Sequence, residues 1–354
     1  MSLDQDQLEQ AVGSVFADLG VGFTGPVVVL GDRLRLWTAM AGAGPLTPAE
    51  LAARTGTVER YVREWLSTMA VAGYVHYDPA ARTFTLTDEM AAVFADDASP
   101  TSLIGVFPAL IACWTDLDAV ERFFRSGGGM GWGEHHPALN GAQARFTRPM
   151  YGAGLARWIG ALDGVAGTLE RGGRIADIGC GYGVASLLMA EAFPAATVVG
   201  IDIDPGSVAT ARKAAADAGV GNRVAFEVAD ATAFPGLDYD LVVFTDCLHD
   251  LGDPVAAAAH ARSTLAPGGT VLVVEPLAAD RLEDDFSNPY ARIGYSVSTL
   301  VCTPSSLAQP GARALGTMAG EKRLRQVLAD AGYSRVRRVA QDAAPLNIVL
   351  EARP

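Results

Sequence analysis

The sequence predicts a mixed α/β protein, in which a doubly wound parallel sheet with an antiparallel last strand follows a mostly helical winged-helix domain. Two observations support this prediction. From residue 173 onward, short apolar runs rich in β-branched residues alternate with helical patterns, which is typical of a parallel sheet covered by helices. Before residue 95, a helix–turn–helix pattern precedes two short strands. We expect three parts: residues 1–98, 99–170 and 171–354.

The first part begins with apolar residues at helical spacing from Leu8 to Leu19. Thr47, Pro48 and Glu50 then mark a helix start, as N-cap, first position and third position. Two helices and a hairpin are predicted after that start, over Pro48–Arg54, Val58–Ala72, Tyr74–Tyr77 and Arg82–Leu86. A helix–turn–helix followed by a hairpin indicates a winged helix.

The middle part reads as helical with one glycine-rich interruption. The twelve residues from Ser126 to Pro137 contain five glycines. Loops of this kind are mobile and often functional, so we expect this one to fold over a pocket.

The third part contains the strands and helices of the sheet. The predicted strands are Arg174–Gly179, Thr197–Ile203, Val224–Ala229, Tyr239–Thr245 and Thr270–Glu275, and a closing hairpin of Arg335–Ala340 and Leu346–Glu351. The predicted helices are Val184–Phe193, Gly206–Ala218, Pro254–Leu265 and Glu321–Ala331. The insertion Leu277–Gly316 is expected to be irregular. The hairpin would add the antiparallel strand.

Charge argues against nucleic acid as a partner. The chain has 27 Lys and Arg against 40 Asp and Glu, a net charge of −13. Between Leu30 and Pro100, six basic residues face nine acidic ones, and the recognition-helix position has Arg60 and Arg63 beside Glu59 and Glu64. A helix that reads DNA needs a basic surface. We therefore predict a dimerisation role for the winged helix, and the apolar helix faces of the first 40 residues favour a homodimer.

Cysteine usage and the N-terminus favour the cytoplasm. Four cysteines stand far apart in the sequence: Cys113, Cys180, Cys247 and Cys302. This spacing does not suggest a disulfide framework. The N-terminus carries acidic residues where a signal peptide would be basic. The apolar stretch Leu103–Trp114 has only 12 residues and is too short to cross a bilayer. We expect no membrane partner.

A glycine loop follows the first predicted strand, in the run Asp177-Ile-Gly179-Cys180-Gly181-Tyr-Gly183. Glycines allow a sharp turn and a close approach to a ligand. The spacing differs from the dinucleotide pattern G-x-G-x-x-G, because the third glycine comes one position early. Asp177 would also repel a pyrophosphate, so a dinucleotide oxidoreductase is disfavoured.

Two further acids follow neighbouring strands. Asp202 lies 19 residues after Gly183, where an acid can accept hydrogen bonds from both ribose hydroxyls. Asp230, followed by Ala231, offers a carboxylate to an exocyclic amine. One acid near an ammonium, one on a ribose and one on an adenine amine suit S-adenosylmethionine (SAM). The predicted cofactor residues are Asp177, Gly179, Cys180, Gly181, Gly183, Asp202, Ile203, Asp230, Ala231 and Thr245.

The run D-x-G-x-G-x-G, then V-G-I-D, then A-D-A, resembles class I SAM-dependent methyltransferases with a Rossmann-like sheet. With the winged helix and the helical linker, the chain is similar to the small-molecule O-methyltransferases of plants and bacteria. The resemblance implies SAM as cofactor, S-adenosylhomocysteine as product, a small-molecule substrate and a homodimer.

His249 follows the fourth strand and could take a proton from an acceptor hydroxyl while the oxygen attacks the methyl group. Glu275 ends the fifth strand, where it could orient His249. The resemblance assigns the same roles to these two residues, with Asp250 beside them. The family's second orienting glutamate has no counterpart, because Met318 aligns there and Glu321 lies three residues away.

The chain has a closer resemblance to an actinobacterial winged-helix methyltransferase group, through C-L-H-D-L-G-D-P at Cys247–Pro254 and C-T-P-S-S-L at Cys302–Leu307. A related branch methylates the β-carbon of 2-oxo acids with a metal held partly by an H-D pair, which His249 and Asp250 match. The further histidine of that branch has no counterpart in residues 301–305. Metal binding is therefore not predicted, and 2-oxo acid methylation stays an alternative.

Several residues are expected around the substrate. By resemblance, Phe146 and Met150 fall beside the methyl donor, and the adjacent Tyr151 is expected there too. Aromatic side chains, the loop and the closing hairpin give the remaining candidates: Trp132, His136, Tyr295 and Asn347. We predict a cytoplasmic, homodimeric SAM-dependent methyltransferase for a small molecule, acting at oxygen. A SAM-sensing transcriptional regulator is the non-enzyme alternative.

Overall fold

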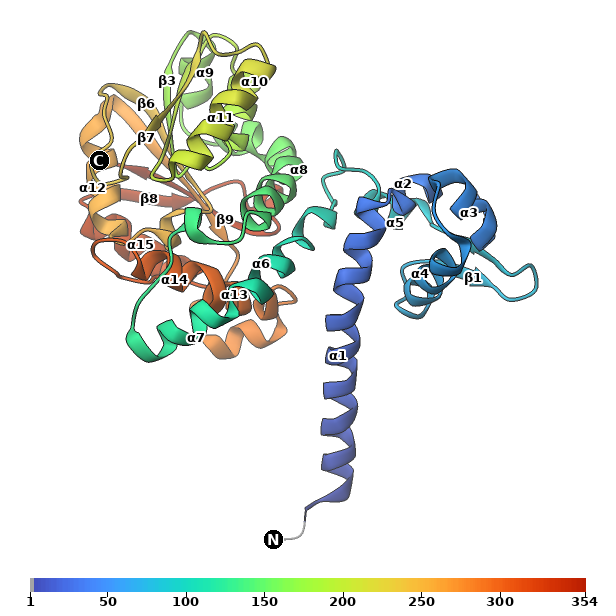
Figure 1. Ribbon diagram of the computed structural model, residues 1–354. Helices are drawn as coiled ribbons and strands as arrows, with labels where there is room; N and C mark the ends of the chain where they lie inside the picture. The colour runs from blue at the N-terminus through green and yellow to red at the C-terminus, as the bar shows by residue number, and fades with distance from the viewer. Residues whose placement is uncertain (1–2) are drawn as a thin grey trace. The chain divides into compact units, whose positions relative to one another are not determined.

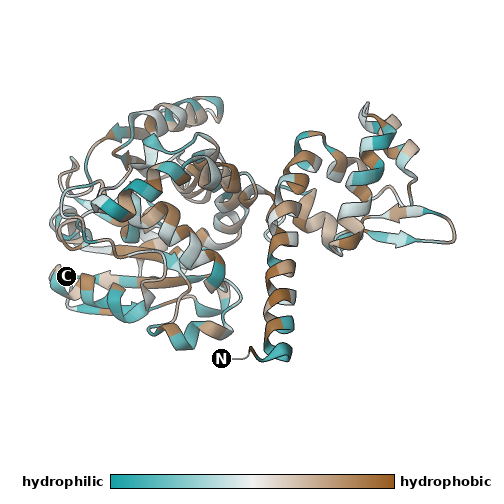
Figure 2. Cartoon of the chain, turned by 60° about the horizontal axis from the view of Figure 1, so that its bottom comes forward, coloured by the Kyte–Doolittle hydropathy of each residue, from teal (hydrophilic) through white to brown (hydrophobic). Residues whose placement is uncertain are grey.

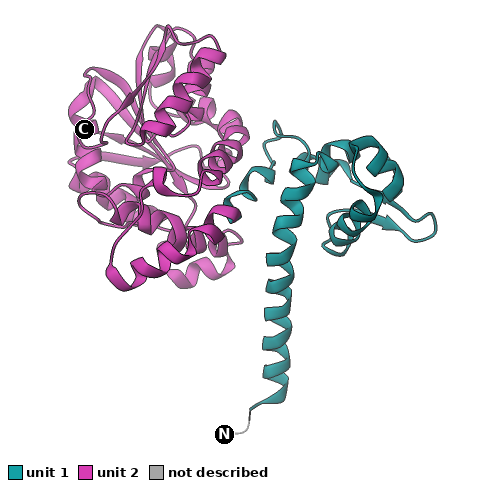
Figure 3. Ribbon diagram, in the orientation of Figure 1, with its two compact units in different colours: residues 1–110 teal, residues 111–354 magenta. Residues whose placement is uncertain are grey.

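The computed structural model describes residues 3–354. The chain divides into two compact units, residues 1–110 and 111–354 (Figure 3). The predicted middle part, 99–170, spans the boundary between these units. Its first residues belong to the first unit, and from residue 111 onward it belongs to the second.

The first unit is mostly helical (Figure 1). Its elements are α1 (Gln5–Arg33), α2 (Leu36–Met40), α3 (Pro48–Thr55), α4 (Glu59–Val71), β1 (His76–Asp78), β2 (Thr83–Thr85), α5 (Asp88–Phe94) and η1 (Ile104–Val106). The strands β1 and β2 pair antiparallel as the predicted wing. Its core is built around Trp37, which contacts the rings of Trp65 and Phe94.

Local chemistry sets the boundaries of α3 as the sequence predicted. Thr47 and Glu50 form a capping box, in which the Thr47 hydroxyl accepts from the backbone of Glu50 and the Glu50 carboxylate accepts from the backbone of Thr47. Gly56 ends the helix with a positive φ of 66°. The helix α1 differs from the rest of this unit, because most of its length is solvent-exposed and carries apolar side chains (Figure 2).

The second unit begins with helices and continues as a seven-stranded sheet. The first helices are α6 (Ala109–Thr115, which crosses the boundary between the units), α7 (Leu117–Ser126), η2 (Trp132–Glu134), α8 (Ala138–Gly160) and α9 (Val165–Glu170). The strands are β3 (Arg174–Ile178), β4 (Thr197–Asp202), β5 (Val224–Val228), β6 (Tyr239–Thr245), β7 (Leu265–Pro276), β8 (Arg335–Arg338) and β9 (Asn347–Arg353). The remaining helices are α10 (Val184–Ala192), α11 (Pro205–Asp217), η3 (Leu248–Asp250), α12 (Pro254–Thr264), η4 (Leu282–Ser287), α13 (Ala291–Val297), η5 (Ser298–Cys302), α14 (Thr303–Leu307), α15 (Gly320–Asp330) and η6 (Gln341–Ala343).

The strand order is β5-β4-β3-β6-β7-β9-β8. The pairs from β5 to β7 are parallel, and β9 runs antiparallel between β7 and β8. The fold class predicted from the sequence is confirmed. The β3–β6 neighbourhood is the point where the strand order reverses, and ligands bind at the carboxyl ends of strands there.

Alternate residues of each strand face two separate cores. Ile175, Leu241 and Leu272 face a core shared with α8, α9, α10 and α11. Ala176, Val242 and Val273 face a core shared with α12 and α15. Strands buried on both faces explain the continuous apolar runs in the sequence.

The insertion after β7 differs from the prediction, because it is not irregular throughout. Residues 291–307 run as α13, η5 and α14 in succession, and η5 is a π-helical turn. Pro304 follows that turn and has no N–H to donate, so the wider turn falls where an α-helix would lose a hydrogen bond. β-Branched residues and proline weakened the helical pattern in the sequence.

Candidate functional site

A cavity of about 150 Å³ opens at the carboxyl ends of β3, β4 and β6. Its floor is the glycine loop, and its walls come from α8, the segment around η2 and the segments after the strands. None of the described residues that line it is Lys or Arg. The lining residues include Trp132, Gln143, Tyr151, Gly179, Cys180, Gly181, Asp202, Ile203, Asp230, Ala231, Thr245, Asp246, Cys247, Asp250 and Gln309.

The glycine loop approaches its neighbours too closely for side chains. Gly179 has a φ of 68°, and a Cβ placed there would lie 2.7 Å from Cβ of Cys247. The N–H of Gly181 donates to Oδ2 of Asp202 at 2.8 Å, which fixes the loop against the end of β4. Gly183 starts α10 with a φ of 78° and does not line the cavity. The loop therefore presents backbone to the cavity at Gly179 and Gly181.

Asp202 lies in the cavity wall, as predicted for a ribose-binding acid. Its Oδ1 accepts from the N–H of Asp204 at 2.9 Å, so both oxygens are oriented by backbone donors. Burial raises the pKa of Asp202, and the backbone hydrogen bonds oppose that shift. Ile203 lies beside it in the lining.

Asp230 and Ala231 line the cavity on the far side of Asp202 along the sheet edge. Oδ1 of Asp230 accepts from both the N–H and the hydroxyl of Thr232, each at 2.7 Å. This turn holds the carboxylate in place at the end of β5. Thr245, at the end of β6, lies in the same lining.

Asp177 takes a different position from the one predicted. It is fully buried beneath the loop, outside the cavity lining, and its Oδ2 accepts from the hydroxyl of Ser186 at 2.6 Å. Its Oδ1 accepts no hydrogen bond. Burial raises the pKa of Asp177 to about 7, against the lowering effect of the Ser186 hydrogen bond.

The imidazole of His249 lies on η3, directly behind the cavity. Its Nδ1 contacts Oε2 of Glu275, and Oε1 of Glu275 accepts from the N–H of Leu248 at 2.8 Å. Both side chains are buried. Burial lowers the pKa of His249, but the carboxylates of Asp250 and Glu275 outweigh it and raise this pKa well above its usual value. The sequence predicted this histidine–glutamate pair, and the structure brings it together.

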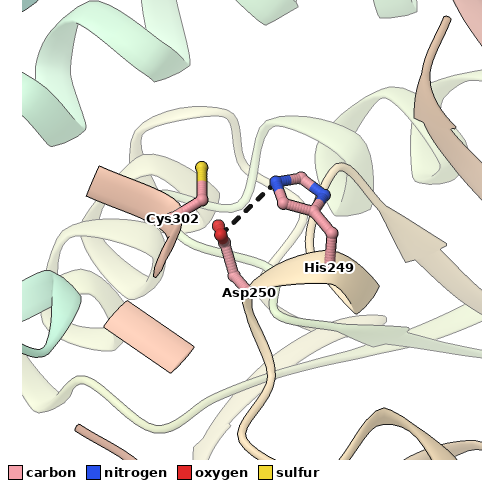
Figure 4. A group of neighbouring side chains, drawn as sticks. All are labelled: His249, Asp250 and Cys302. Carbon is pink, nitrogen blue, oxygen red and sulfur yellow. Dashed lines mark ion pairs between the residues drawn. The ribbon is translucent and has the colours of Figure 1, made fainter. Parts of the chain in front are cut away.

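Asp250 and Cys302 complete a compact group with His249 (Figure 4). Oδ1 of Asp250 is 3.3 Å from Nε2 of His249, and Oδ2 accepts from the indole N–H of Trp132 at 3.1 Å. The sulfur of Cys302 and these two ligand atoms all lie within 4.8 Å of one another. Cys302 was not predicted as a site residue, because the expected signal at residues 301–305 was a histidine.

Asp246 is a second residue that the sequence analysis missed. It lines the cavity directly after β6, with a φ of 48°. The hydroxyl of Tyr151 donates to its Oδ2 at 2.5 Å, and the amide of Asn347 lies 3.4 Å from its Oδ1. Burial and the charge of Glu275 raise the pKa of Asp246 to about 7. A polar residue directly after a buried strand was the signal available for it.

The segment around η2 folds against the site, as expected for the glycine-rich loop. Gly129 packs on α14, where a Cβ would lie 2.2 Å from the carbonyl oxygen of Pro304. The N–H of Met130 donates to the same oxygen at 3.0 Å. These contacts place Trp132 in the cavity wall. Of the two adjacent histidines, His135 is buried, with Nδ1 2.9 Å from Asp116.

Five predicted contact residues lie outside the cavity lining. His136 accepts from the N–H of Ala138 at 3.2 Å and so caps the entry to α8. Phe146 and Met150 lie on α8, and Met150 packs against the first core. Tyr295 donates to Asp285 at 3.1 Å. Asn347 does not line the cavity, but its amide contacts Asp246, which does.

Comparisons with known proteins agree with this geometry. Residues 169–332 match a family model described as "Methyltransferase domain", and residues 23–95 match one described as "Rv2258c-like winged HTH domain". The chain therefore contains a methyltransferase domain behind a winged helix-turn-helix domain, as the sequence predicted.

Among curated proteins, a trans-aconitate 2-methyltransferase from Streptomyces avermitilis is 36% identical over 104 residues, which are 29% of this chain and 39% of that protein. The matches span between a quarter and about half of the length of the first curated relatives. Two solved structures are similar over nearly the whole chain. The mitomycin 7-O-methyltransferase MmcR has a TM-score of 0.71 and 18% identity, covering 99% of this chain and all of that chain. Human N-acetylserotonin methyltransferase in complex with SAM has a TM-score of 0.69 and 19% identity, covering all of this chain and 99% of that chain. At these identities the likeness establishes the fold.

Proposed function

We propose, on the basis of the methyltransferase domain at residues 169–332, that the protein transfers a methyl group from SAM to a small molecule, releasing S-adenosylhomocysteine. The observation that supports this most is the lining of one cavity. The glycine loop contributes backbone without side chains, and Asp202 and Asp230 contribute carboxylates that hydrogen bonds hold in place.

The charge of the cavity favours SAM over a dinucleotide. Asp202, Asp230, Asp246 and Asp250 line it, and the described lining residues include no cation. The charged groups that a pyrophosphate would meet there are carboxylates, which repel it, whereas a sulfonium and an ammonium would be attracted to them. The two oxygens of Asp202 are oriented to accept the ribose hydroxyls, and Asp230 is the acceptor for the adenine amine.

For the chemical step we propose O-methylation with His249 as general base. In its neutral form, His249 accepts the proton of the acceptor hydroxyl at Nε2, the oxygen forms a bond to the methyl carbon, and the carbon–sulfur bond breaks with its electron pair on sulfur. Glu275, in contact with Nδ1, would stabilise the imidazolium that forms. The buried position of the pair behind the cavity keeps water from competing for the proton.

Calorimetric titration with S-adenosylhomocysteine tests the cofactor assignment. We expect micromolar binding, weakened at least about tenfold in Asp202→Asn, because an amide offers one acceptor oxygen to two hydroxyls. Asp217→Ala changes an exposed acid of α11 and should bind as the parent does. If the parent protein gives no binding heat, or if Asp202→Asn binds equally well, the cofactor assignment fails.

Two other functions remain as alternatives. Metal-assisted C-methylation of a 2-oxo acid would use the same cofactor with a metal at His249 and Asp250. A SAM-sensing regulator would instead bind DNA through α4. On that helix Arg60 and Arg63 pair with Glu64 and Glu59, which removes the cations that DNA binding would need.

We also propose that the protein is a cytoplasmic homodimer formed through α1. Large apolar side chains on this helix are exposed: Leu8, Val12, Val15, Phe16, Leu19, Val21, Phe23 and Leu30. Among the described helices, α1 is the one that is long and apolar enough to cross a membrane by length and composition, and 17% of its most apolar window is buried. A second copy would cover this surface. The four free cysteines fit a reducing compartment.

A further inference from the structure

We propose that His249, Asp250 and Cys302 form a binding site for one divalent cation of borderline softness, with Zn²⁺ as the natural occupant. This inference goes beyond the methyl-transfer proposal and does not depend on it. The three residues come from η3 and from the last residue of η5.

The nitrogen and oxygen ligand atoms are spaced as a tetrahedral ion requires. Nε2 of His249 and Oδ1 of Asp250 are 3.3 Å apart. Metal bonds of about 2.0–2.1 Å at a tetrahedral angle place two such ligands about 3.3–3.4 Å apart. The sulfur of Cys302 lies within 4.8 Å of both atoms, and Figure 4 shows it next to the carboxylate of Asp250.

The imidazole is already oriented for metal binding. Its Nδ1 contacts Glu275, which leaves Nε2 as the atom that points toward Asp250. A carboxylate on the other ring nitrogen is the usual second partner of a metal-binding histidine. Glu275 is itself held by the N–H of Leu248. The ring orientation therefore does not need the metal to set it.

Asp250 supplies an independent observation. It is about 96% buried, and its Oδ1 makes no hydrogen bond and has only the ion-pair contact with Nε2 of His249 at 3.3 Å. Its other oxygen accepts from Trp132. A buried carboxylate oxygen held only by one long contact is costly, and a cation between Oδ1, Nε2 and the Cys302 sulfur would satisfy it.

The backbone conformation at Cys302 also supports a metal site. Cys302 ends the π-helical turn η5, and such turns are frequent at functional sites. Its sulfur accepts from the hydroxyl of Thr317 at 2.9 Å, a contact that would support a thiolate ligand. One nitrogen, one oxygen and one sulfur ligand select Zn²⁺ or a similar transition metal, because Mg²⁺ and Ca²⁺ prefer oxygen ligands alone.

The negative charge around the site also favours a bound cation. Three buried carboxylates, Asp246, Asp250 and Glu275, lie around the ring of His249. In the described hydrogen bonds and ion pairs of these carboxylates, His249 is the one group that can carry positive charge. A divalent cation would compensate the negative charge that one imidazolium leaves unbalanced.

Occupation of the site would change the role of His249. A metal on Nε2 takes the lone pair that a general base needs, so base and ligand are alternative states of the same residue. Asp250 lines the cavity, so the ion would reach the site from there and would leave a coordination position for water or an acceptor oxygen.

The test uses Co²⁺ as a spectroscopic probe on the full-length protein after removal of metals with a chelator. We expect saturation at one equivalent, with the near-ultraviolet absorption of a thiolate-to-cobalt charge transfer. Cys302→Ser should lose this absorption and weaken Co²⁺ binding at least about tenfold. Cys113→Ser changes a cysteine outside the group and should behave as the parent does.

Saturation without the charge-transfer absorption, an unchanged absorption in Cys302→Ser, or no saturable binding would each overturn the proposal. Titration of the same metal-free protein with S-adenosylhomocysteine separates this result from the proposed function. Failure of the metal site leaves that binding intact, whereas failure of the cofactor assignment leaves Co²⁺ binding intact. Binding of S-adenosylhomocysteine by Cys302→Ser also reports that this variant is folded.

Discussion

Glu275 holds the backbone and the side chain of the His249 segment at the same time, because one of its oxygens accepts from the N–H of Leu248 and the other contacts Nδ1 of His249. The carboxylate comes from the end of β7 and the imidazole from η3, so the register of two neighbouring strands fixes the ring. This arrangement fits both roles discussed for His249, since a base and a metal ligand each need Nε2 free.

Removal of the base should affect turnover and not cofactor binding. In His249→Ala we expect kcat with a competent acceptor to fall about 10²–10⁴-fold, because the acceptor loses its proton-accepting partner. Binding of S-adenosylhomocysteine should be unchanged, since His249 lies outside the cavity lining. The measurements are steady-state kinetics and calorimetry. Turnover near the parental rate would mean that the reaction proceeds by proximity alone.

Glu275→Gln separates positioning from proton transfer. Gln can still accept from the Leu248 N–H, but it cannot stabilise an imidazolium. We expect kcat to fall at least about tenfold, with KM for the acceptor unchanged. A rise in KM at constant kcat would show instead that Glu275 only shapes the cavity.

Gly129 should be intolerant of a side chain. A Cβ in Gly129→Ala would lie 2.2 Å from the Pro304 carbonyl oxygen, so the loop must move away from α14 and take Trp132 with it. We expect a loss of about 1–3 kcal/mol in the free energy of unfolding and weaker acceptor binding. Gly141→Ala is the matched control, because nothing lies within 4 Å of its Cβ position. Equal urea midpoints for the two variants would contradict this prediction.

Asp177 should make stability fall as pH rises. Burial raises its pKa to about 7 in the folded protein, whereas an unperturbed aspartate has a pKa of about 3.9, so the folded state binds the proton more tightly. The stabilising contribution is complete below pH 4 and is lost as pH rises through 7. The side chain in Asp177→Asn does not titrate. The free energy of unfolding of this variant, relative to that of the parent, should therefore increase by up to about 4 kcal/mol between pH 4 and pH 8. Denaturant unfolding without cofactor measures it, and a pH-independent difference would refute it.

The sequence predicted the sheet well because its strands are buried on both faces and its helices begin at strong caps such as Asp204-Pro205 and Asp253-Pro254. The glycine loop, Asp202, Asp230 and the His249–Glu275 pair were also found, since each follows a strand end and the carboxyl ends of parallel strands meet at one edge.

Tertiary packing explains what the sequence analysis missed. Asp177 was expected in the cavity, but its side chain points under the loop to Ser186, which a strand-end position alone does not reveal. Cys302 reaches His249 only because residues 291–307 are helical and include a π turn. Asp246 depends on a left-handed backbone that is uncommon for aspartate and is held by Tyr151.

The apolar surface of α1 gives the last prediction, which concerns assembly. Phe16 is 70% exposed and Leu19 52% exposed on this helix. If a second copy covers them, a Phe16→Glu, Leu19→Glu double variant would bury charges at the interface, and the dimer dissociation constant should rise at least about 100-fold. Val71→Glu changes a side chain that is 92% exposed at the end of α4, outside α1, and should leave the dimer intact. Sedimentation equilibrium measures both. A parent protein that is monomeric at micromolar concentration would refute the dimer, and flotation with lipid vesicles would then point to a membrane as the surface that α1 contacts.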